Sequence, residues 1–205
     1  MTRIVAPPPG AAPRLQLTER QSATVDALLD AALEEVRDVG FEELTIRSVA
    51  RRAGLTHTTA YSYFTSKAHL ISELHWRQLR SLPAPEVPPD ASFVDRVGAA
   101  FEGPAAALAG DPDLSRAVSV AIVSDEPDVT RLRGAVGAEL VRRLRTALGP
   151  YDDAELVGAL FMAYSGAMML SGAGTGDFLE VIPRMRTLAR LIAPTGRPDT
   201  RGHHR

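Results

Sequence analysis

The stretch FEELTIRSVARRAGLTHTTAYSYFTSKAHL, residues 41–70, decides the fold because it carries the signals of two short helices joined by a tight turn. Thr45 stands where an N-cap belongs, and the apolar residues behind it recur on one side of a helix. Gly54 follows where that helix should end in a left-handed turn, which glycine adopts without steric cost. Thr56 can cap a second helix over residues 56–63. This arrangement predicts a helix-turn-helix.

The second helix is rich in small hydroxyl residues and tyrosines, which are not the residues of an ordinary solvated helix face. Helical spacing places one group on the outward face: His57, Thr58, Tyr61 and Ser62. It turns a second group toward the body of the protein: Thr59, Ala60 and Tyr63. Short donors and acceptors beside an amphipathic ring suit a surface that approaches bases and phosphates. The alternative is that the hydroxyls only cap and the tyrosines only pack.

Charge is distributed unevenly around this helix pair. No Asp or Glu occurs from Leu44 through Ser72, although the whole chain has a formal net charge of −2. The same window contains four cations: Arg47, Arg51, Arg52 and Lys67. Lys67 would lie in the first turn of a third helix, where a cation opposes the helix dipole unless a phosphate is nearby. The alternative for Lys67 is an exposed side chain with a small energetic cost. The basic window favours a phosphate-facing surface.

The pattern T-x-R-x-V-A-x-x-A-G-L-T-x-x-T-x-Y-x-Y-F-x-S-K, which begins at Thr45, resembles the DNA-binding segment of the tetracycline-repressor (TetR) family. The resemblance covers about residues 18–80. It implies a dimeric bacterial transcription regulator, usually a repressor, that binds double-stranded operator DNA and a small-molecule effector. It implies DNA contacts from the first helix by Thr45 and Arg47. It implies mainly phosphate contacts by Thr56, Thr59, Tyr61, Tyr63 and Lys67. It implies contacts with base edges by His57, Thr58 and Ser62.

The fold class that we expect is all-α, with an N-terminal three-helix DNA-binding domain and a C-terminal helical bundle for effector binding and dimerisation. Five segments are expected: a disordered arm (1–17), the helix-turn-helix domain with its connecting helix (18–80), a proline-rich linker (81–90), the helical domain (91–193) and a disordered tail (194–205). The helical pattern of the fourth segment predicts helices near 90–109, 112–123, 127–148, 152–172 and 177–193. The first of these should be interrupted at Gly103–Pro104.

Apolar stripes in the helical domain are read as core, between which an effector pocket can open. The candidate effector-binding residues are Trp76, Phe93, Val97, Phe101, Val118, Ile122, Phe161 and Tyr164. Trp76 lies on the connecting helix, where Leu70 and Leu74 should face the DNA-binding domain and Leu79 the helical domain. It is equally consistent with a core anchor and with a pocket wall.

Small and large apolar residues alternate on the last two helices in a pattern typical of a four-helix dimer contact. The candidate interface residues are Ala159, Ala163, Gly166, Ala167, Phe178, Ile182, Met185 and Ile192. The alternative is that this face packs inside one chain.

Other classes of function are disfavoured. The chain has 205 residues, 45% of them hydrophobic, and no cysteine, which excludes a disulfide framework and cysteine-based zinc sites. We find no signal peptide, no segment approaching the length of a membrane span, no metal-ligand spacing and no cofactor or nucleophile motif. The expectation is a cytoplasmic, non-enzymatic regulator without cofactor or metal. The alternative is a helical ligand- or partner-binding protein that does not bind an operator.

Overall fold

The computed structural model describes residues 19–193, and every regular element within that range is helical. Four helices come first: α1 (Glu19–Glu43), α2 (Ile46–Arg52), α3 (His57–Tyr63) and α4 (Lys67–Ser81). Five more follow after a non-helical linker: α5 (Phe93–Ala109), α6 (Pro112–Ala121), α7 (Pro127–Leu148), α8 (Ala154–Gly172) and α9 (Phe178–Ile192). A short 3-10 turn, Gly149–Tyr151, joins α7 to α8. The predicted all-α class is confirmed. The predicted arm and tail lie outside the described residues.

Local sequence signals set the helix ends as expected. The hydroxyls of Thr45, Thr56 and Ser66 each accept a hydrogen bond from the backbone N–H three residues later, at 3.0, 3.1 and 2.9 Å. Each bond satisfies a backbone donor that the first turn of a helix leaves free. Gly54 has a φ of 69°, so the turn between α2 and α3 uses the left-handed conformation that glycine favours.

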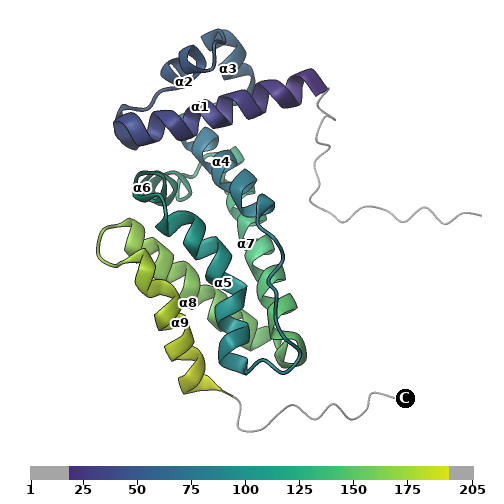
Figure 1. Ribbon diagram of the computed structural model, residues 1–205. Helices are drawn as coiled ribbons and strands as arrows, with labels where there is room; N and C mark the ends of the chain where they lie inside the picture. Colours follow the sequence, from purple (N-terminus) through teal and green to yellow (C-terminus); the bar gives the residue numbers. More distant parts are fainter. Residues whose placement is uncertain (1–18, 194–205) are drawn as a thin grey trace, which may run out of the picture.

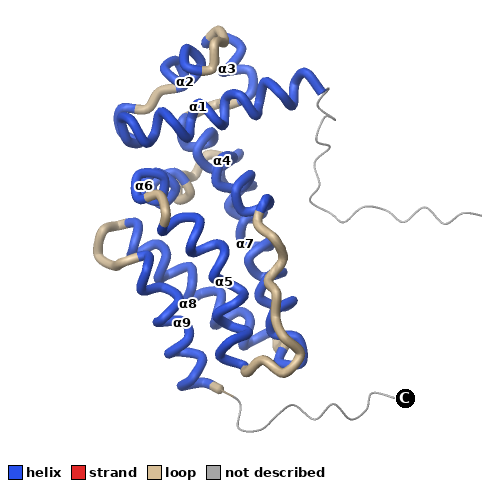
Figure 2. The backbone as a smooth tube through the Cα atoms, in the orientation of Figure 1, coloured by secondary structure: helices blue, strands red, loops and turns tan. Residues whose placement is uncertain are grey.

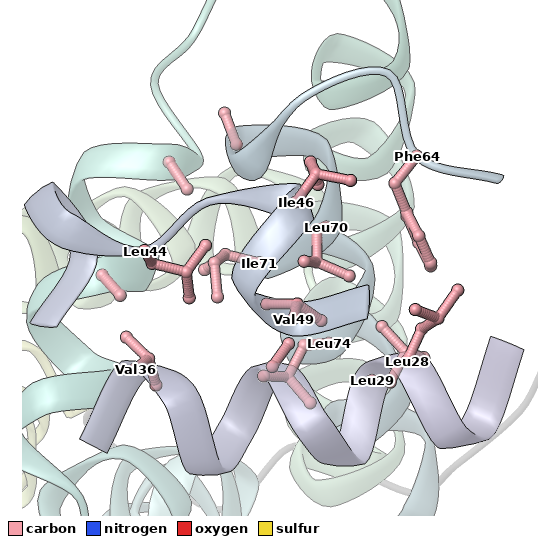
Figure 3. Close-up of a cluster of buried hydrophobic side chains, with 14 of the residues drawn as sticks. Leu28, Leu29, Val36, Leu44, Ile46, Val49, Phe64, Leu70, Ile71 and Leu74 are labelled. Carbon is pink, nitrogen blue, oxygen red and sulfur yellow. The ribbon is translucent and has the colours of Figure 1, made fainter. Parts of the chain in front are cut away.

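Helices α1–α3, called the head below, pack against the first half of α4. Figure 3 shows the side chains that meet there: Leu28, Leu29 and Val36 from α1, Val49 from α2, and Leu70, Ile71 and Leu74 from α4. All of them are buried, and burial of one such side chain contributes about 1.5–3 kcal/mol. The same cluster extends to Leu114 of α6 and Val129 of α7. Head and body therefore share one core through α4.

Helices α5–α9, called the body below, form the lower part of the molecule in Figure 1. There α9 packs on both α5 and α8, α7 also packs on both α5 and α8, and α6 lies between α1 and the rest of the body. Helix α4 descends from the head to pack on both α6 and α7. A displacement within the body can therefore reach the head through α4 and through α6.

The linker from Leu82 to Ser92 follows the body as an extended segment, drawn in tan in Figure 2. Two buried arginines hold its backbone. Arg143 of α7 donates to the carbonyls of Leu79, Leu82 and Pro83, at 3.2, 2.7 and 2.6 Å. Arg96 of α5 donates to three linker carbonyls, at 2.9–3.3 Å, and to that of Ala147. The linker and the last turn of α4 are thereby fixed to the body.

Helix α1 is kinked at Gly40, whose φ is 75° and whose backbone is non-helical. Two expectations need correction. Helix α5 is not interrupted at Gly103–Pro104 but runs through both residues. Helix α8 is long and apolar enough to cross a membrane by length and composition alone, with a mean hydropathy of 1.3. The expectation that no segment approaches such a length is therefore wrong. Within the chain only 22% of that helix window is buried.

Candidate functional site

The helix-turn-helix presents part of its predicted DNA-contacting set at the surface. Arg47, His57, Thr58 and Tyr61 are exposed, and Tyr61 keeps 54% of its surface open. Ala60 is buried, which orients α3 as its helical spacing predicts. Thr59 and Tyr63 are half-buried, on the side that turns toward the head. The exposed group offers donors, acceptors and a cation on adjoining positions of α2 and α3.

Several of the predicted hydroxyls already have partners within the chain. Thr45 and Ser48 form a reciprocal capping box, with side chain to backbone distances of 3.0 and 3.2 Å. The hydroxyls of Thr56 and Thr59 lie 2.9 Å apart, and Ser62 donates to the carbonyl of Thr59 at 2.6 Å. The alternative of purely structural hydroxyls thus accounts for Thr45, Thr56, Thr59 and Ser62, but not for His57 or Thr58.

The basic surface is narrower than the sequence indicates. Arg52 pairs with three acids of α1, at 2.6 Å from Glu35, 2.5 Å from Asp38 and 3.6 Å from Glu34. Its hydrogen bonds to Asp38 and Glu35 raise the pKa of Arg52 above its ordinary value. Arg47 and Arg51, in contrast, have no acidic partner among residues 19–193. Two of the arginines therefore keep their charge available for phosphates.

Lys67 has an internal role that the sequence did not reveal. Its Nζ donates to the carbonyls of Phe41 and Glu42, both at 2.9 Å, and lies 4.6 Å from the centre of the Phe41 ring. These carbonyls belong to the last turn of α1, which attracts cations. A phosphate is therefore not needed to explain a lysine in the first turn of α4. One N–H of its ammonium group remains for another acceptor.

Two acidic residues of the body hold the head from either side of α6. Asp111, the N-cap of α6, accepts from Nε of Arg37 in α1 at 2.7 Å. Glu126, just before α7, accepts at 2.5 Å from the hydroxyl of Ser66, the N-cap of α4, which connects the head to that helix. Each contact joins a loop next to α6 to the head, in addition to the shared apolar core. The position of α6 is therefore coupled to the orientation of the head.

A cavity of about 690 Å³ lies in the body below the head. Its volume falls within the range of small-molecule sites. Helices α4–α8 line it, through mostly apolar side chains that include Leu79, Leu108, Ile122, Phe161 and Met168. Helix α7 contributes Gly134, Gly137 and Ala138, whose small size leaves the space open. At Gly137 an added Cβ would stand 3.4 Å from the Phe161 ring.

Four of the eight predicted effector-binding residues line this cavity: Val118, Ile122, Phe161 and Tyr164. The other four do not line it: Trp76, Phe93, Val97 and Phe101. The three from α5 are buried where α5 packs on α7 and α9. Trp76 is half-buried beside Arg80 and packs against the body core, so the core-anchor alternative describes it better.

Two of the polar residues that line the cavity are His75 and Tyr164, of which the sequence predicted Tyr164 but not His75. His75 of α4 lines it beside Leu79, and burial lowers the pKa of His75 to about 4. Tyr164 of α8 also lines it, and burial raises the pKa of its hydroxyl. The position of His75 next to Trp76, on the connecting helix, is the feature of the sequence that could have predicted His75 as a cavity residue.

Helices α8 and α9 expose an apolar surface that no described residue covers. It includes several large side chains: Met162, Met169, Leu170, Leu179, Leu191 and Ile192. Of the predicted interface residues, Ala159, Gly166 and Ile192 are exposed, and a further four are half-buried: Ala163, Ala167, Phe178 and Ile182. Met185 is only 2% exposed because it points into the body core, so its assignment to the interface is wrong.

Among residues 19–193 no group of three or more His, Cys, Asp or Glu could hold a metal ion. The candidate sites are thus the exposed side of α2 and α3, the cavity, and the apolar surface of α8 and α9.

Comparisons with known proteins agree with this geometry. Residues 28–74 match the family described as "Bacterial regulatory proteins, tetR family". An HTH-type transcriptional regulator of Mycobacterium tuberculosis (strain ATCC 25618 / H37Rv) is 35% identical over 186 residues, covering 89% of this chain and 87% of that protein.

Solved structures share the fold. A TetR transcriptional regulator from Rhodococcus sp. RHA1 has a TM-score of 0.70 at 24% identity, over 84% of this chain and 96% of that one. FadR of Thermus thermophilus, a TetR-family transcriptional repressor in complex with lauroyl-CoA, has a TM-score of 0.58 at 19% identity, over 87% and 99%. At these identities the likeness concerns the fold alone.

Proposed function

Because this chain belongs to the TetR family of bacterial transcriptional regulators, we propose that it is a cytoplasmic repressor whose homodimer leaves its operator when a small, mostly apolar molecule enters the cavity. Membership makes the chain a DNA-binding transcriptional regulator rather than an enzyme. The repressing action, the operator geometry, the effector class and the residues below are our proposals.

The observation that carries the proposal is the divided packing of α4. Its first half, with Leu70, Ile71 and Leu74, is part of the core of the head. Its second half, with His75 and Leu79, forms a wall of the cavity. A molecule that prefers a wider or narrower cavity must therefore act on the helix that carries the head.

On the DNA side, Arg47 supplies an unpaired charge for a phosphate, and Tyr61 an exposed hydroxyl. His57 and Thr58, whose side chains have no hydrogen-bond partner among residues 19–193, read base edges. The capping residues Thr45, Thr56 and Thr59 and the half-buried Tyr63 contact phosphates at the margin. Ser62 supports the base-reading face, and Lys67 uses its remaining N–H for a phosphate.

The exposed apolar surface of α8 and α9 supports a homodimer in which both helices pair with their symmetry mates. The predicted residues other than Met185 remain candidates for this contact. A two-fold dimer presents two identical heads, so the preferred DNA is an inverted repeat. Both heads must match one spacing, and a tilt of α4 costs affinity without unfolding the protein.

Release follows from differential affinity. The effector shifts the dimer only by as much as it prefers the released shape, which typically amounts to about 1–3 kcal/mol of coupling. The contacts of Asp111 and Glu126 with the head provide a second route from the cavity wall in α6.

The experiment begins with selection of the operator from a random duplex library, followed by fluorescence anisotropy over a salt series. We expect an inverted repeat and a steep loss of affinity with salt. Arg47→Ala should weaken binding and reduce the salt slope by about one unit. Arg116→Ala is the matched control, because Arg116 is an exposed arginine of α6, on the other side of α1 from α2 and α3.

Effector release is tested by titrating a ligand into the dimer with and without saturating operator. Reciprocity requires DNA to change ligand affinity by the same factor by which the ligand changes DNA affinity. Equal ligand affinities in the two conditions would rule out release by that ligand. Failure to bind any DNA at low salt would instead favour a helical ligand- or partner-binding protein.

A further inference from the structure

Three polar side chains of the cavity have no hydrogen-bond partner within the described part of the chain: His75, Tyr164 and Ser165. Tyr164 is only 3% exposed, and its ring stacks on Phe101 with centroids 4.1 Å apart and planes 8° apart. That stack fixes the ring and hence the position of its hydroxyl. The polar atoms of His75 and Tyr164 remain accessible from the cavity, so a ligand or water there can complete their hydrogen bonds.

The protonation states of both groups are set by burial. The lowered pKa of His75, about 4, keeps the imidazole neutral near pH 7, with one N–H donor and one acceptor nitrogen. The raised pKa of Tyr164 keeps its hydroxyl protonated, so it can donate and accept. Both groups are therefore suited to an uncharged oxygen.

The cavity lining offers a ligand one cation and no anion. It contains no Asp, Glu or Lys, and Arg133 is its single cation. The guanidinium of Arg133 donates to the carbonyls of Ile122 and Ser124, at 2.8 and 3.0 Å, and to the Thr130 hydroxyl at 3.3 Å. These bonds to neutral acceptors fix the exposed Arg133 side chain beside the residues that follow α6. An ionised ligand group that does not reach Arg133 would lose its hydration without gaining a partner.

We propose that the effector is an uncharged, largely apolar alcohol or ketone, whose oxygen is bound by the His75 imidazole and the Tyr164 hydroxyl. This inference rests on the proposed function, because it identifies the class of molecule that occupies the cavity. The proposal distinguishes this cavity from a site that binds an anionic ligand.

The expected preference can be stated as a ratio. A carboxylate bound beside His75 and Tyr164 must either stay without a charge partner or be accompanied by a proton taken up by the carboxylate or by His75, and both are unfavourable near pH 7. A site that hydrogen-bonds a hydroxyl also discriminates against ligands that leave its polar groups unpaired. The alcohol should therefore bind at least tenfold more tightly than the carboxylate of the same chain length.

The test uses four probes with one ten-carbon chain: 1-decanol, 2-decanone, decanoate and decanoyl-CoA. Binding to the full-length dimer is measured by calorimetry at pH 7, and operator release by anisotropy. The variant is Tyr164→Phe, which removes the hydroxyl and keeps the stack on Phe101. Tyr151→Phe is the matched control, because Tyr151 lies outside the cavity against Phe93. His75→Phe removes the second group, and melting curves establish that each variant is folded.

The expected result is binding of 1-decanol and 2-decanone, at least tenfold weaker binding of decanoate, and a loss of about tenfold in decanol affinity in Tyr164→Phe but not in Tyr151→Phe. Decanoate or decanoyl-CoA binding as tightly as decanol would overturn this inference, while their release of the operator would leave the proposed function standing. Unchanged decanol affinity in folded Tyr164→Phe would also overturn it. Binding of none of the four probes would overturn this inference, while operator binding measured without ligand would leave the proposed DNA-binding function standing.

Discussion

Replacing Asp111 or Arg37 by alanine, singly and together, measures how firmly α6 holds the head. Asp111 has two functions on two different oxygens. Its Oδ1 accepts the backbone N–H of Leu114 at 3.1 Å and caps α6, while its Oδ2 accepts from Nε of Arg37 at 2.7 Å. Arg37 has only the second function. The two single variants should therefore differ by the free energy of the cap.

The magnitudes follow from exposure. The Arg37 side chain is 52% exposed and that of Asp111 10%, so the pair is screened more than a buried pair and less than a surface pair. We assign it about 1 kcal/mol, at the upper end for surface pairs. Loss of an N-cap costs about 1 kcal/mol. Arg37→Ala should then destabilise by about 1 kcal/mol, and Asp111→Ala and the double variant each by about 2 kcal/mol.

The assay is urea unfolding of all four proteins at one protein concentration, because dimerisation makes stability depend on concentration. The double-mutant cycle should give a coupling of about 1 kcal/mol. The Asp113–Arg116 pair on the same helix is the matched control, since it is 3.4 Å apart and its side chains are 48% and 70% exposed. Its coupling should be close to zero. Additive losses in the Arg37–Asp111 cycle, or equal losses in the two single variants, would refute the reasoning.

Three further predictions concern the body. Met162→Arg places a charge on the apolar surface of α8, where Met162 is 72% exposed, and light scattering should show a 22.0 kDa monomer with weakened operator binding. Gly137→Leu pushes on Phe161 and fills the cavity, so calorimetry should show lost ligand binding while operator affinity persists. Burial lowers the pKa of His75 from 6.5 to about 4, so its contribution to stability is complete above pH 6.5 and is lost as the pH falls toward 4. His75→Asn should reduce the acid-induced loss of unfolding free energy by about 3 kcal/mol, whereas an unchanged pH profile would contradict an imidazole that stays neutral in the folded protein.

Sequence reasoning succeeded where short-range chemistry decides the outcome. Thr45, Gly54 and Thr56 each act within one helical turn, so their side chains and backbone preferences fix the helix ends almost independently of tertiary context. The apolar period of α4 likewise separated Leu70 from Leu79, because residues on one side of a helix must pack on the same neighbour.

It failed where the outcome depends on what lies opposite in space. The basic window contained Arg52, but the acids that neutralise it come from α1, outside that window. Phe101 and Tyr164 have equally apolar neighbours in sequence. Tyr164 nevertheless lines the cavity, whereas Phe101 stacks on Tyr164 and does not line it. A stripe of apolar residues shows which face of a helix is buried, but it does not show whether that face meets other side chains or a cavity. Here the cavity depends on Gly134 and Gly137, which lie on another helix.

The hydrogen bonds from Arg96 and Arg143 to the linker backbone determine which changes of the linker sequence the protein can tolerate. Both guanidiniums bind backbone carbonyls, which every residue type carries, so substitutions along the linker leave these bonds chemically possible. Selection can then alter the linker sequence freely while conserving its path. A chimaera that joins a foreign head to this body should keep its sensing geometry if the junction preserves the carbonyls of residues 79–83 at the same distance along the chain. Inserting a single residue there would shift those carbonyls out of register with Arg143. Ligand binding in the body would then no longer change the orientation of the head.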